Sequence, residues 1–379
     1  MTSDTSDTSD TSDTSDTSDT SDIVARLRSP YSSGAMITAR DGIVGALRRP
    51  VGSPGDDPRF TDLSSQMPRW EPWVRRQVVD FDLWSSLWLD ANRPDTSGGD
   101  DGIKLKIRDA AANTVDDYEG KNQLVKLLRP SSSYLLEHQL DHVFDYADLR
   151  RDRAPEIAAQ ASHFVNFFAS ICHLDPDRSR YTFELIEAFR FAVVAIQMRT
   201  KHALASRRPV DLSAQVMPMI PTPGHSSFPA GHAVEAFMMA TILAELLADQ
   251  EKKVYGDGFW RDVLMRLAAR ISVNRVVAGL HFPVDLAGGM VLGLQLGRYF
   301  VALAKGGKTE LTGWKFDAQE YGKEDFPWRD ILGLIDSGSG ATSYLKPRKN
   351  TFVVPETDPA RSPLCWLWAQ ATAEWRDTR

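Results

Sequence analysis

Apolar residues recur with the period of an α-helix from about residue 134 to residue 304. In the segment 231–249 residues such as Val234, Phe237 and Ile242 surround much of the expected helix axis, which is typical of a helix at the centre of a large bundle. The pattern therefore predicts an all-α fold, a helical bundle. We expect its helices over 134–150, 155–173, 181–206, 231–249, 259–277 and 283–304, separated by clusters of Pro, Gly or Asp.

The segments on either side of this bundle show no sustained helical period. Residues 23–66 are rich in Gly, Pro, Ser, Arg and Asp, which is typical of an irregular linker or wrapping segment. Trp84 and Trp88 are four residues apart, as on one face of a helix, and we expect them to pack against the main body. The run from Ile103 to Ile107 indicates a short strand. Residues 305–379 are mixed in character and are expected to wrap the bundle irregularly, so that residues 67–379 form a single domain.

The N-terminus consists of seven Thr-Ser-Asp repeats over residues 2–22. The repeats contain no apolar residue, so burial cannot offset the loss of chain entropy on folding, and we expect residues 1–22 to be a disordered tail. They also lack the basic and apolar regions of a secretory signal.

Charge and hydropathy narrow the classes of partner. A net charge of -7 and a pI near 5.7 argue against a nucleic-acid surface, which would need a basic face. After the expected start of the last bundle helix, the longest uncharged stretch, residues 286–297, is a dozen residues long, whereas a spanning helix needs roughly 20 apolar residues. The mean hydropathy of -0.31 agrees. We therefore expect no membrane span and a cytoplasmic location.

Three short blocks of chemically active residues follow one another within the expected bundle. The first reads K-x6-R-P and contains Lys201 and Arg208. The second reads P-A-G-H and ends in Gly231 and His232. The third reads R-x5-H-x3-D and consists of Arg275, His281 and Asp285.

The first two blocks have the chemistry of an anion site. Lys201 and Arg208 are seven residues apart, and we expect both to leave one face of the helix that Pro209 ends. Arg supplies a planar pair of donors and Lys a compact point charge. Gly231 opens the next helix, where free backbone N–H groups and the positive end of the helix dipole attract an anion. His232 is then suited to exchange a proton with an apical oxygen of the bound group.

The third block adds a cation and a histidine with a carboxylate partner. Arg275 can reach the anion from a third helix, and His281 follows Gly279, which is expected to end that helix. Asp285 is placed to accept the other imidazole proton of His281, which would fix the tautomer and raise the basicity of the free nitrogen.

Together the three blocks resemble the signature of the type 2 phosphatidic acid phosphatase (PAP2) and vanadium haloperoxidase superfamily, over the motif core 183–297. The resemblance implies the helical bundle of this superfamily, with a phosphate or vanadate held between cations and two histidines. It implies that His281 bonds directly to phosphorus or vanadium. Ala230 departs from the usual P-S-G-H, because it replaces a serine whose hydroxyl would contact the oxyanion.

His225 stands seven residues before His232. The vanadium bromoperoxidases carry a further histidine at this offset, but soluble phosphatase-like relatives can carry one too. The resemblance implies that His225 lies beside the oxyanion site and supports its ligands.

The resemblance leaves three functions open. We expect a soluble vanadate-dependent haloperoxidase, in which His281 holds vanadate as cofactor and the substrates are peroxide and halide. The alternative is a soluble PAP2-type acid phosphatase, without cofactor, that hydrolyses a phosphate ester through a phosphohistidine. The third is an oxyanion-binding module whose catalytic site has decayed, as Ala230 would indicate. The long chain around the motif core and His225 favour the haloperoxidase. The HFPVD sequence at 281–285 favours the phosphatase.

Overall fold

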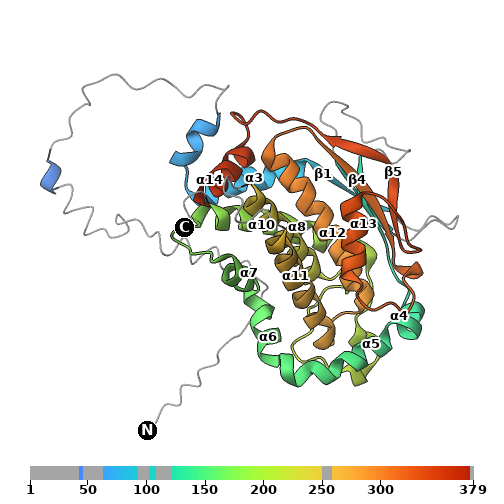
Figure 1. Ribbon diagram of the computed structural model, residues 1–379. Coiled ribbons are helices and arrows are strands. Elements are labelled where there is room, and N and C mark those ends of the chain that lie inside the picture. The colour runs from blue at the N-terminus through green and yellow to red at the C-terminus, as the bar shows by residue number, and fades with distance from the viewer. Residues whose placement is uncertain (1–41, 46–62, 93–101, 108–121, 250–257, 376–379) are drawn as a thin grey trace, which may run out of the picture. The chain divides into compact units, whose positions relative to one another are not determined.

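The computed structural model describes residues 42–45, 63–92, 102–107, 122–249 and 258–375 (Figure 1). The chain divides into two compact units, Met1–Asp57 and Pro58–Arg379. In the first unit the described residues 42–44 are helical. The prediction of a disordered tail over 1–22 and most of the linker predicted over 23–66 lie outside the described residues. Everything below concerns the second unit.

Four long helices form the centre of the second unit, and their predicted positions are confirmed. α10 packs on the other three, with which it forms the apolar core around the motif blocks (Figure 1). Fourteen of its 18 residues are buried, in a run from 233 to 247 that only Glu245 interrupts, because neighbours cover the helix on all sides. The four helices are α8 (Arg180–Leu204), α10 (Gly231–Ala248), α11 (Phe259–Val277) and α12 (Pro283–Lys305).

The contact between α10 and α12 depends on glycines spaced four residues apart on one face of α12. A Cβ atom at Gly293 would lie 2.3 Å from the backbone oxygen of Val234, and one at Gly289 would lie 2.6 Å from that of Ala230. At Gly297 a Cβ atom would lie 2.9 Å from the side chain of Thr241. Only hydrogen atoms fit at these positions, so the two helix backbones approach closely along their length.

Two of the predicted helices are broken into shorter pieces. The helix predicted over 134–150 is α4 (Ser132–His138), α5 (Leu140–Asp145) and a 3₁₀ turn, η3 (Tyr146–Leu149). Gln139 lies at the first break and is fully buried. Its side chain is satisfied there by two hydrogen bonds: Nε2 donates to the carbonyl oxygen of Gly322 at 2.9 Å, and Oε1 accepts from Val284 N at 3.0 Å. The helix predicted over 155–173 is α6 (Arg150–His163) and α7 (Val165–Cys172).

A five-stranded sheet corrects the all-α prediction. Its order is β1-β2-β3-β4-β5, and all neighbours are antiparallel except β3 and β4, which are parallel. The fold is mostly helical, but the segments on either side of the bundle are not irregular wrapping. The strands are β1 (Leu87–Asn92), β2 (Gly102–Ile107), β3 (Gln123–Leu128), β4 (Thr309–Asp317) and β5 (Leu345–Val354). The strand predicted at 103–107 is β2.

The sheet has its own buried side chains and packs on α12 through β3 and β4. Leu124 and Leu127 of β3 and Trp314 and Phe316 of β4 are fully buried. The partners β3 and β4 are some 180 residues apart in sequence, and each strand is too short to show a sustained period. No local pattern could therefore reveal their pairing.

The remaining elements cover the bundle and the sheet. Trp84 lies in α3 and Trp88 in β1, so they do not share a helix face, and about two fifths of each residue is exposed, 41% and 42%. The elements are η2 (Leu63–Arg69), α3 (Pro72–Ser85), α9 (Pro209–Leu212), η4 (Ala214–Val216), η6 (Ala318–Glu320), α13 (Trp328–Ser337) and α14 (Pro363–Glu374).

Among the described residues, helices α10 and α12 are long and apolar enough to cross a membrane by length and composition. Within the protein, 83% of the apolar window of α10 and 89% of that of α12 are buried. The sequence-based prediction of no membrane span considered only the longest stretch of residues without a charge. A mean over 18 residues tolerates isolated charges such as Asp285 and Arg298, which flank the apolar stretch of α12.

Candidate active site

The K-x6-R-P block does not lie on one helix. α8 ends at Leu204, because Ala205 adopts a left-handed conformation with φ 47°. Arg208 follows in extended conformation, as is usual before a proline, and Pro209 begins the short helix α9. The Asp211 side chain accepts the Arg208 backbone N–H at 2.8 Å and closes this turn. The prediction of a shared helix face is therefore wrong, yet the turn brings Arg208 back toward Lys201.

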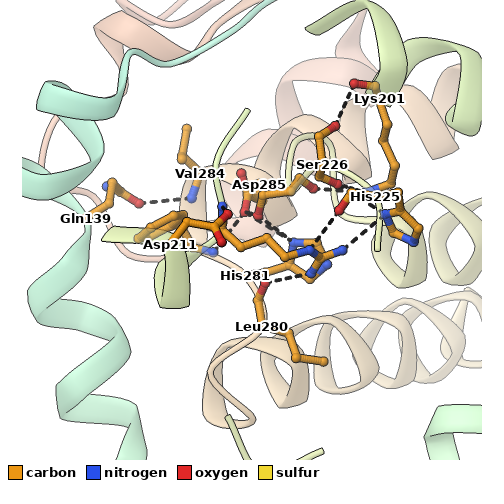
Figure 2. A network of polar contacts seen from close by, with 12 residues as sticks. Gln139, Lys201, Asp211, His225, Ser226, Leu280, His281, Val284 and Asp285 are labelled. Atoms are coloured by element: carbon orange, nitrogen blue, oxygen red, sulfur yellow. Dashed lines mark hydrogen bonds and ion pairs between the residues drawn. The ribbon is translucent and has the colours of Figure 1, made fainter. Parts of the chain in front are cut away.

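Lys201 and Arg208 both hold the loop that precedes the P-A-G-H block (Figure 2). Lys201 Nζ donates to the carbonyl oxygens of Ser226 and Ser227, at 3.0 Å each, and Ser226 Oγ donates back to the Lys201 carbonyl oxygen at 2.6 Å. Arg208 Nε donates to the carbonyl oxygen of His225, and its Nη1 to that of Leu280, both at 2.9 Å. The two cations thus join the second block to the third.

His225 lies beside Arg208. Arg208 Nη2 is 3.1 Å from His225 Nδ1, and the Ser226 carbonyl oxygen is 3.2 Å from the same nitrogen. A guanidinium group only donates, so Nδ1 accepts the shorter of these two contacts and the neutral ring carries its proton on Nε2. Burial, and after it the charge of Lys201, lowers the pKa of His225 to about 4, which keeps the ring neutral and able to accept from Arg208.

Contacts with α12 and β4 hold the P-A-G-H turn in place. The backbone N–H of Ala230 donates to the Asp285 carbonyl oxygen at 2.9 Å. The Phe228 ring stacks on Phe316 of β4 with 6.2 Å between ring centroids, and it fills the space where a Cβ atom at Gly288 would lie. α12 and the sheet therefore support the turn that opens α10.

His281 is held by two partners at one of its ring nitrogens. Asp285 Oδ2 lies 3.2 Å from His281 Nδ1, and Ser227 Oγ lies 3.1 Å from the same nitrogen. Asp285 Oδ2 also accepts from Ser227 Oγ at 2.5 Å and from the Phe282 backbone N–H at 3.0 Å. Since the carboxylate only accepts, Nδ1 carries the proton and Nε2 keeps its lone pair. The predicted pairing of His281 with Asp285 is present.

Arg275 enters from the end of α11, and Gly279 with φ 78° turns the chain toward His281, as predicted. Its Nη2 donates to the Ile157 carbonyl oxygen at 3.2 Å and to Gln160 Oε1 at 3.4 Å. Its Nε and Nη1 are buried and have no hydrogen-bond partner within the described residues. A charged donor pair left in this state fits an anionic ligand, because an unpaired buried charge is otherwise costly.

His232 is in the first turn of α10, but its contacts differ from the expectation. Its Nε2 lies 3.0 Å from the Gln160 carbonyl oxygen, so this nitrogen donates to α6. The Phe164 ring covers the imidazole, with 5.4 Å between ring centroids. Only Nδ1 remains to exchange a proton with a ligand.

The electrostatics of the site follow from its burial. Lys201 and Arg275 are each 1% exposed and Arg208 is 3% exposed. Burial, and then repulsion by Arg208, lowers the pKa of Lys201 to about 7, and burial lowers that of Arg275 to about 10. Burial and the two cations Arg208 and Lys201 hold the pKa of His281 well below its usual range. His281 is therefore neutral at pH 7, as a nucleophile or ligand must be.

The residues of the site differ in exposure. Gly231 and His232 at the start of α10, and His225 and Ser226 in the loop, are partly exposed, whereas the cations and His281 are buried. The first N–H groups of α10 and the buried cations are the donors that this part of the protein offers to an anion. A tetrahedral oxyanion such as phosphate or vanadate fits these donors, with His281 as the residue that would bond to it.

Several polar residues of the site were not among the predicted ones. Ser227 donates a hydrogen bond to Asp285 and lies close to His281. The only sequence signal for Ser227 was its position two residues before Pro229, in the loop that leads to the P-A-G-H block. Asp211 gave a readable signal, since an acidic residue three positions after an N-cap is a capping pattern. Gln139 and Gln160 lie far from the blocks in sequence and gave none. Gln197 lies one helical turn before Lys201, but a glutamine in a helix carries no specific signal.

The fold and the site together define a helical protein with a buried cationic site built around a histidine. Residues 183–306 match the model of the PAP2 superfamily, so this part of the chain is a PAP2 superfamily domain. Among curated proteins, the undecaprenyl-diphosphatase of Sulfolobus acidocaldarius is 29% identical over 109 residues, which are 29% of this chain and 48% of that protein. The chain thus spans about half the length of the curated relative that it matches.

Among solved structures, a transmembrane PAP2 type phosphatidylglycerolphosphate phosphatase from Bacillus subtilis is 18% identical to the chain. The match covers 44% of this chain and 84% of that one, with a TM-score of 0.36. The family match and the curated phosphatase relative support the prediction, made from the three blocks, that the chain is an enzyme. The named relatives are phosphatases, so they do not support the finer prediction of a soluble haloperoxidase-like branch.

Two further predictions are corrected. The expectation that no segment could span a membrane is corrected, because α10 and α12 both have the length and composition of a spanning helix, although more than 80% of each apolar window is buried. The cytoplasmic location was inferred from the missing span and the missing secretory signal, so it is withdrawn with the first of these.

Proposed function

We propose that the chain is a PAP2-type phosphatase that hydrolyses a phosphate monoester or a diphosphate. The observation that carries this proposal is the set of buried cations around two histidines: Lys201 and Arg208 lie beside the neutral His281, and Arg275 lies beside His232. The carboxylates Asp285, Asp211 and Glu235 offset only part of the charge of Lys201 and Arg208, and two N–H groups of Arg275 have no hydrogen-bond partner among the described residues. A phosphate dianion would balance the excess charge and accept these bonds.

In the first step His281 attacks phosphorus. Its Nε2 lone pair forms the N–P bond, and the bond from phosphorus to the leaving oxygen breaks. Asp285 accepts from Nδ1–H and stabilises the positive charge that develops on the ring. The three cations and the N–H groups of α10 stabilise the equatorial oxygens without having to reorganise, which is usually the largest catalytic contribution.

The leaving oxygen receives its proton from His232. Burial and the charge of Arg275 lower the pKa of this ring in the free protein, so it takes up the second proton only with the phosphate dianion bound beside it. When protonated, this ring keeps its Nε2–H on the Gln160 carbonyl oxygen and has Nδ1–H to give. In the second step a water oxygen attacks phosphorus, the N–P bond breaks, and the electron pair returns to His281. The water proton passes to His232 Nδ1, which restores the starting state.

The haloperoxidase alternative has less support. The cation cluster would hold vanadate as readily as phosphate, since both are tetrahedral oxyanions, and His225 contacts Arg208. Both named relatives, however, are phosphatases. The decayed-site alternative rested on Ala230, but the buried cations, His281 and Asp285 keep the arrangement that catalysis needs.

Phosphate release by the purified full-length chain tests the proposal. We would assay p-nitrophenyl phosphate, inorganic pyrophosphate and an isoprenoid diphosphate in detergent, and trap the enzyme after brief exposure to ³²P-labelled substrate. We expect release of phosphate, competitive inhibition by vanadate, and label that is stable to alkali and released by acid, as for phosphohistidine. Halide oxidation by peroxide in the presence of vanadate, without phosphate release, would instead favour the haloperoxidase.

A further inference from the structure

The buried side-chain amide of Gln197, which lies beside the start of α10, has a role that no residue of the three motif blocks supplies. Gln197 is on α8, one helical turn before Lys201, and is 2% exposed. Its Oε1 has no hydrogen-bond partner within the described part of the chain. An unpartnered buried carbonyl oxygen costs free energy, so a native structure that keeps one calls for an explanation.

This oxygen lies against the residue that opens α10. A Cβ atom at Gly231 would lie 3.2 Å from Gln197 Oε1 and 3.4 Å from its Nε2. A side chain there would crowd the amide, so the glycine leaves room for Gln197 beside the anion-binding end of the helix. His232, the residue that exchanges the proton in the proposed reaction, follows directly.

The orientation of the amide is fixed by a chain of contacts on its other side. Gln197 Nε2 donates to Glu235 Oε1 at 2.8 Å, and Arg190 Nε donates to Glu235 Oε2 at 3.0 Å. The Glu235 carboxylate, which forms an ion pair with Arg190, accepts the hydrogen bond from Gln197, so the amide presents its N–H group to Glu235 and its oxygen toward Gly231.

An acceptor beside a phosphate site repels the phosphate oxygens and binds a group that carries hydrogen. In a phosphatase the group that must enter with its hydrogens in a set direction is the attacking water. We propose that Gln197 is a positioning residue that accepts a hydrogen bond from the water that hydrolyses phosphorylated His281. This inference rests on the proposed phosphatase function. The second hydrogen of that water then points to His232 and its lone pair to phosphorus.

The test measures the two half-reactions separately by rapid-quench kinetics with ³²P-labelled substrate. Gln197→Leu should slow loss of label from the phosphoenzyme by roughly 10- to 100-fold. Formation of the phosphoenzyme should stay within about twofold, so that label accumulates. Gln295→Leu is the matched control, because Gln295 is also buried (1% exposed) but lies on α12 ten residues, or about 15 Å, beyond Asp285. It should leave both half-reactions unchanged.

Equal slowing of both half-reactions, or a dephosphorylation rate within twofold of the parent, would overturn the role of Gln197. If Gln197→Leu does not fold, Gln197→Asn keeps a buried amide but withdraws its oxygen by one methylene, and should still slow dephosphorylation selectively. A parent enzyme that forms no phosphoenzyme and releases no phosphate would overturn the proposed function itself, which is a distinct outcome.

Discussion

The helical region α8–α12, residues 180–305, and the sheet β1–β5 differ in how their contacts are distributed along the chain. In this region, here called the core, the functional side chains come from elements that follow one another closely, although Arg275 and His232 also bond to α6. In the sheet, β3 and β4 pair across some 180 residues. The core holds the buried charges, whereas the described strands supply mainly apolar side chains to the interior.

This difference indicates a division of labour between chemistry and support. The sheet reaches the site at one described ring contact, where Phe316 stacks on Phe228 below the P-A-G-H turn. Changes in the core should therefore alter catalysis, and most changes in the sheet should alter stability alone. The predictions below test this division, beginning with the largest expected effect.

His281→Ala should reduce turnover by at least about three orders of magnitude, because it removes the proposed nucleophile. The circular dichroism spectrum and melting temperature should stay close to those of the parent. Phosphate release by the purified variant checks this prediction. More than a few per cent residual activity would remove His281 from the reaction.

The sheet offers a matched pair of substitutions. Phe352→Ala and Phe316→Ala each remove a buried ring, and each should lower the free energy of unfolding by about 3–5 kcal/mol. Phe352 pairs with Leu311, toward the other end of β4 from Phe316, and its loss should leave kcat/KM of the folded enzyme unchanged. Phe316→Ala should also lower kcat/KM, because the turn at Phe228 loses its support. Equal kcat/KM in the two variants would show that the sheet does not influence the site.

The close approach of α10 and α12 can be broken by a single methyl group. Gly293→Ala should destabilise the protein by about 1–3 kcal/mol, since the new Cβ would lie 2.3 Å from a backbone oxygen that cannot move away alone. Gly333→Ala on α13 is the control, because no atom lies within 4 Å of its Cβ position. The control should be stabilising by up to about 1 kcal/mol, as alanine favours a helix over glycine. Chemical denaturation of both variants measures the difference.

The charge of Lys201 should set a pH limit on anion binding. Its pKa of about 7 means that the amine loses its proton as the pH rises through 7, so the affinity of the free enzyme for phosphate should fall. The fall should reach up to about tenfold for each pH unit above the pKa. In Lys201→Arg the charge persists, and this limb should move to higher pH. Inhibition by phosphate at pH 6 to 9 measures both proteins, and superimposable profiles would exclude Lys201 as the titrating group.

The smallest effect is expected at Ala230, the N-cap of α10, whose side chain makes no capping hydrogen bond. Ala230→Ser restores the hydroxyl usual in the superfamily. A capping bond would add about 0.5–2 kcal/mol of stability, and a bond to the anion would raise vanadate affinity by roughly tenfold. Calorimetric titration with vanadate separates the two outcomes. Equal tight binding by parent and variant would mean that another group already supplies this contact.

The sequence by itself determined the parts of this protein that depend on local spacing. Helices α8, α10, α11 and α12 follow from apolar periodicity, and α11 begins and ends at the predicted residues. His281 and Asp285 meet because four residues at the start of a helix place them together, a geometry that needs no distant partner. The cations Lys201, Arg208 and Arg275 were predicted from their blocks, although the turn at Ala205 that joins the first two was not.

Only the tertiary structure decided what depends on distant contacts. The pairing of β3 with β4, the break at Gln139 and the place of Gln197 beside Gly231 join segments that carry no mutual signal in sequence. Burial decided the charges as well, since the depressed pKa of Lys201 arises from removal of water by elements across the fold. The spacing of residues in sequence predicts which side chains share a helical turn. Desolvation and long-range packing depend on the folded chain as a whole, so sequence spacing does not predict them.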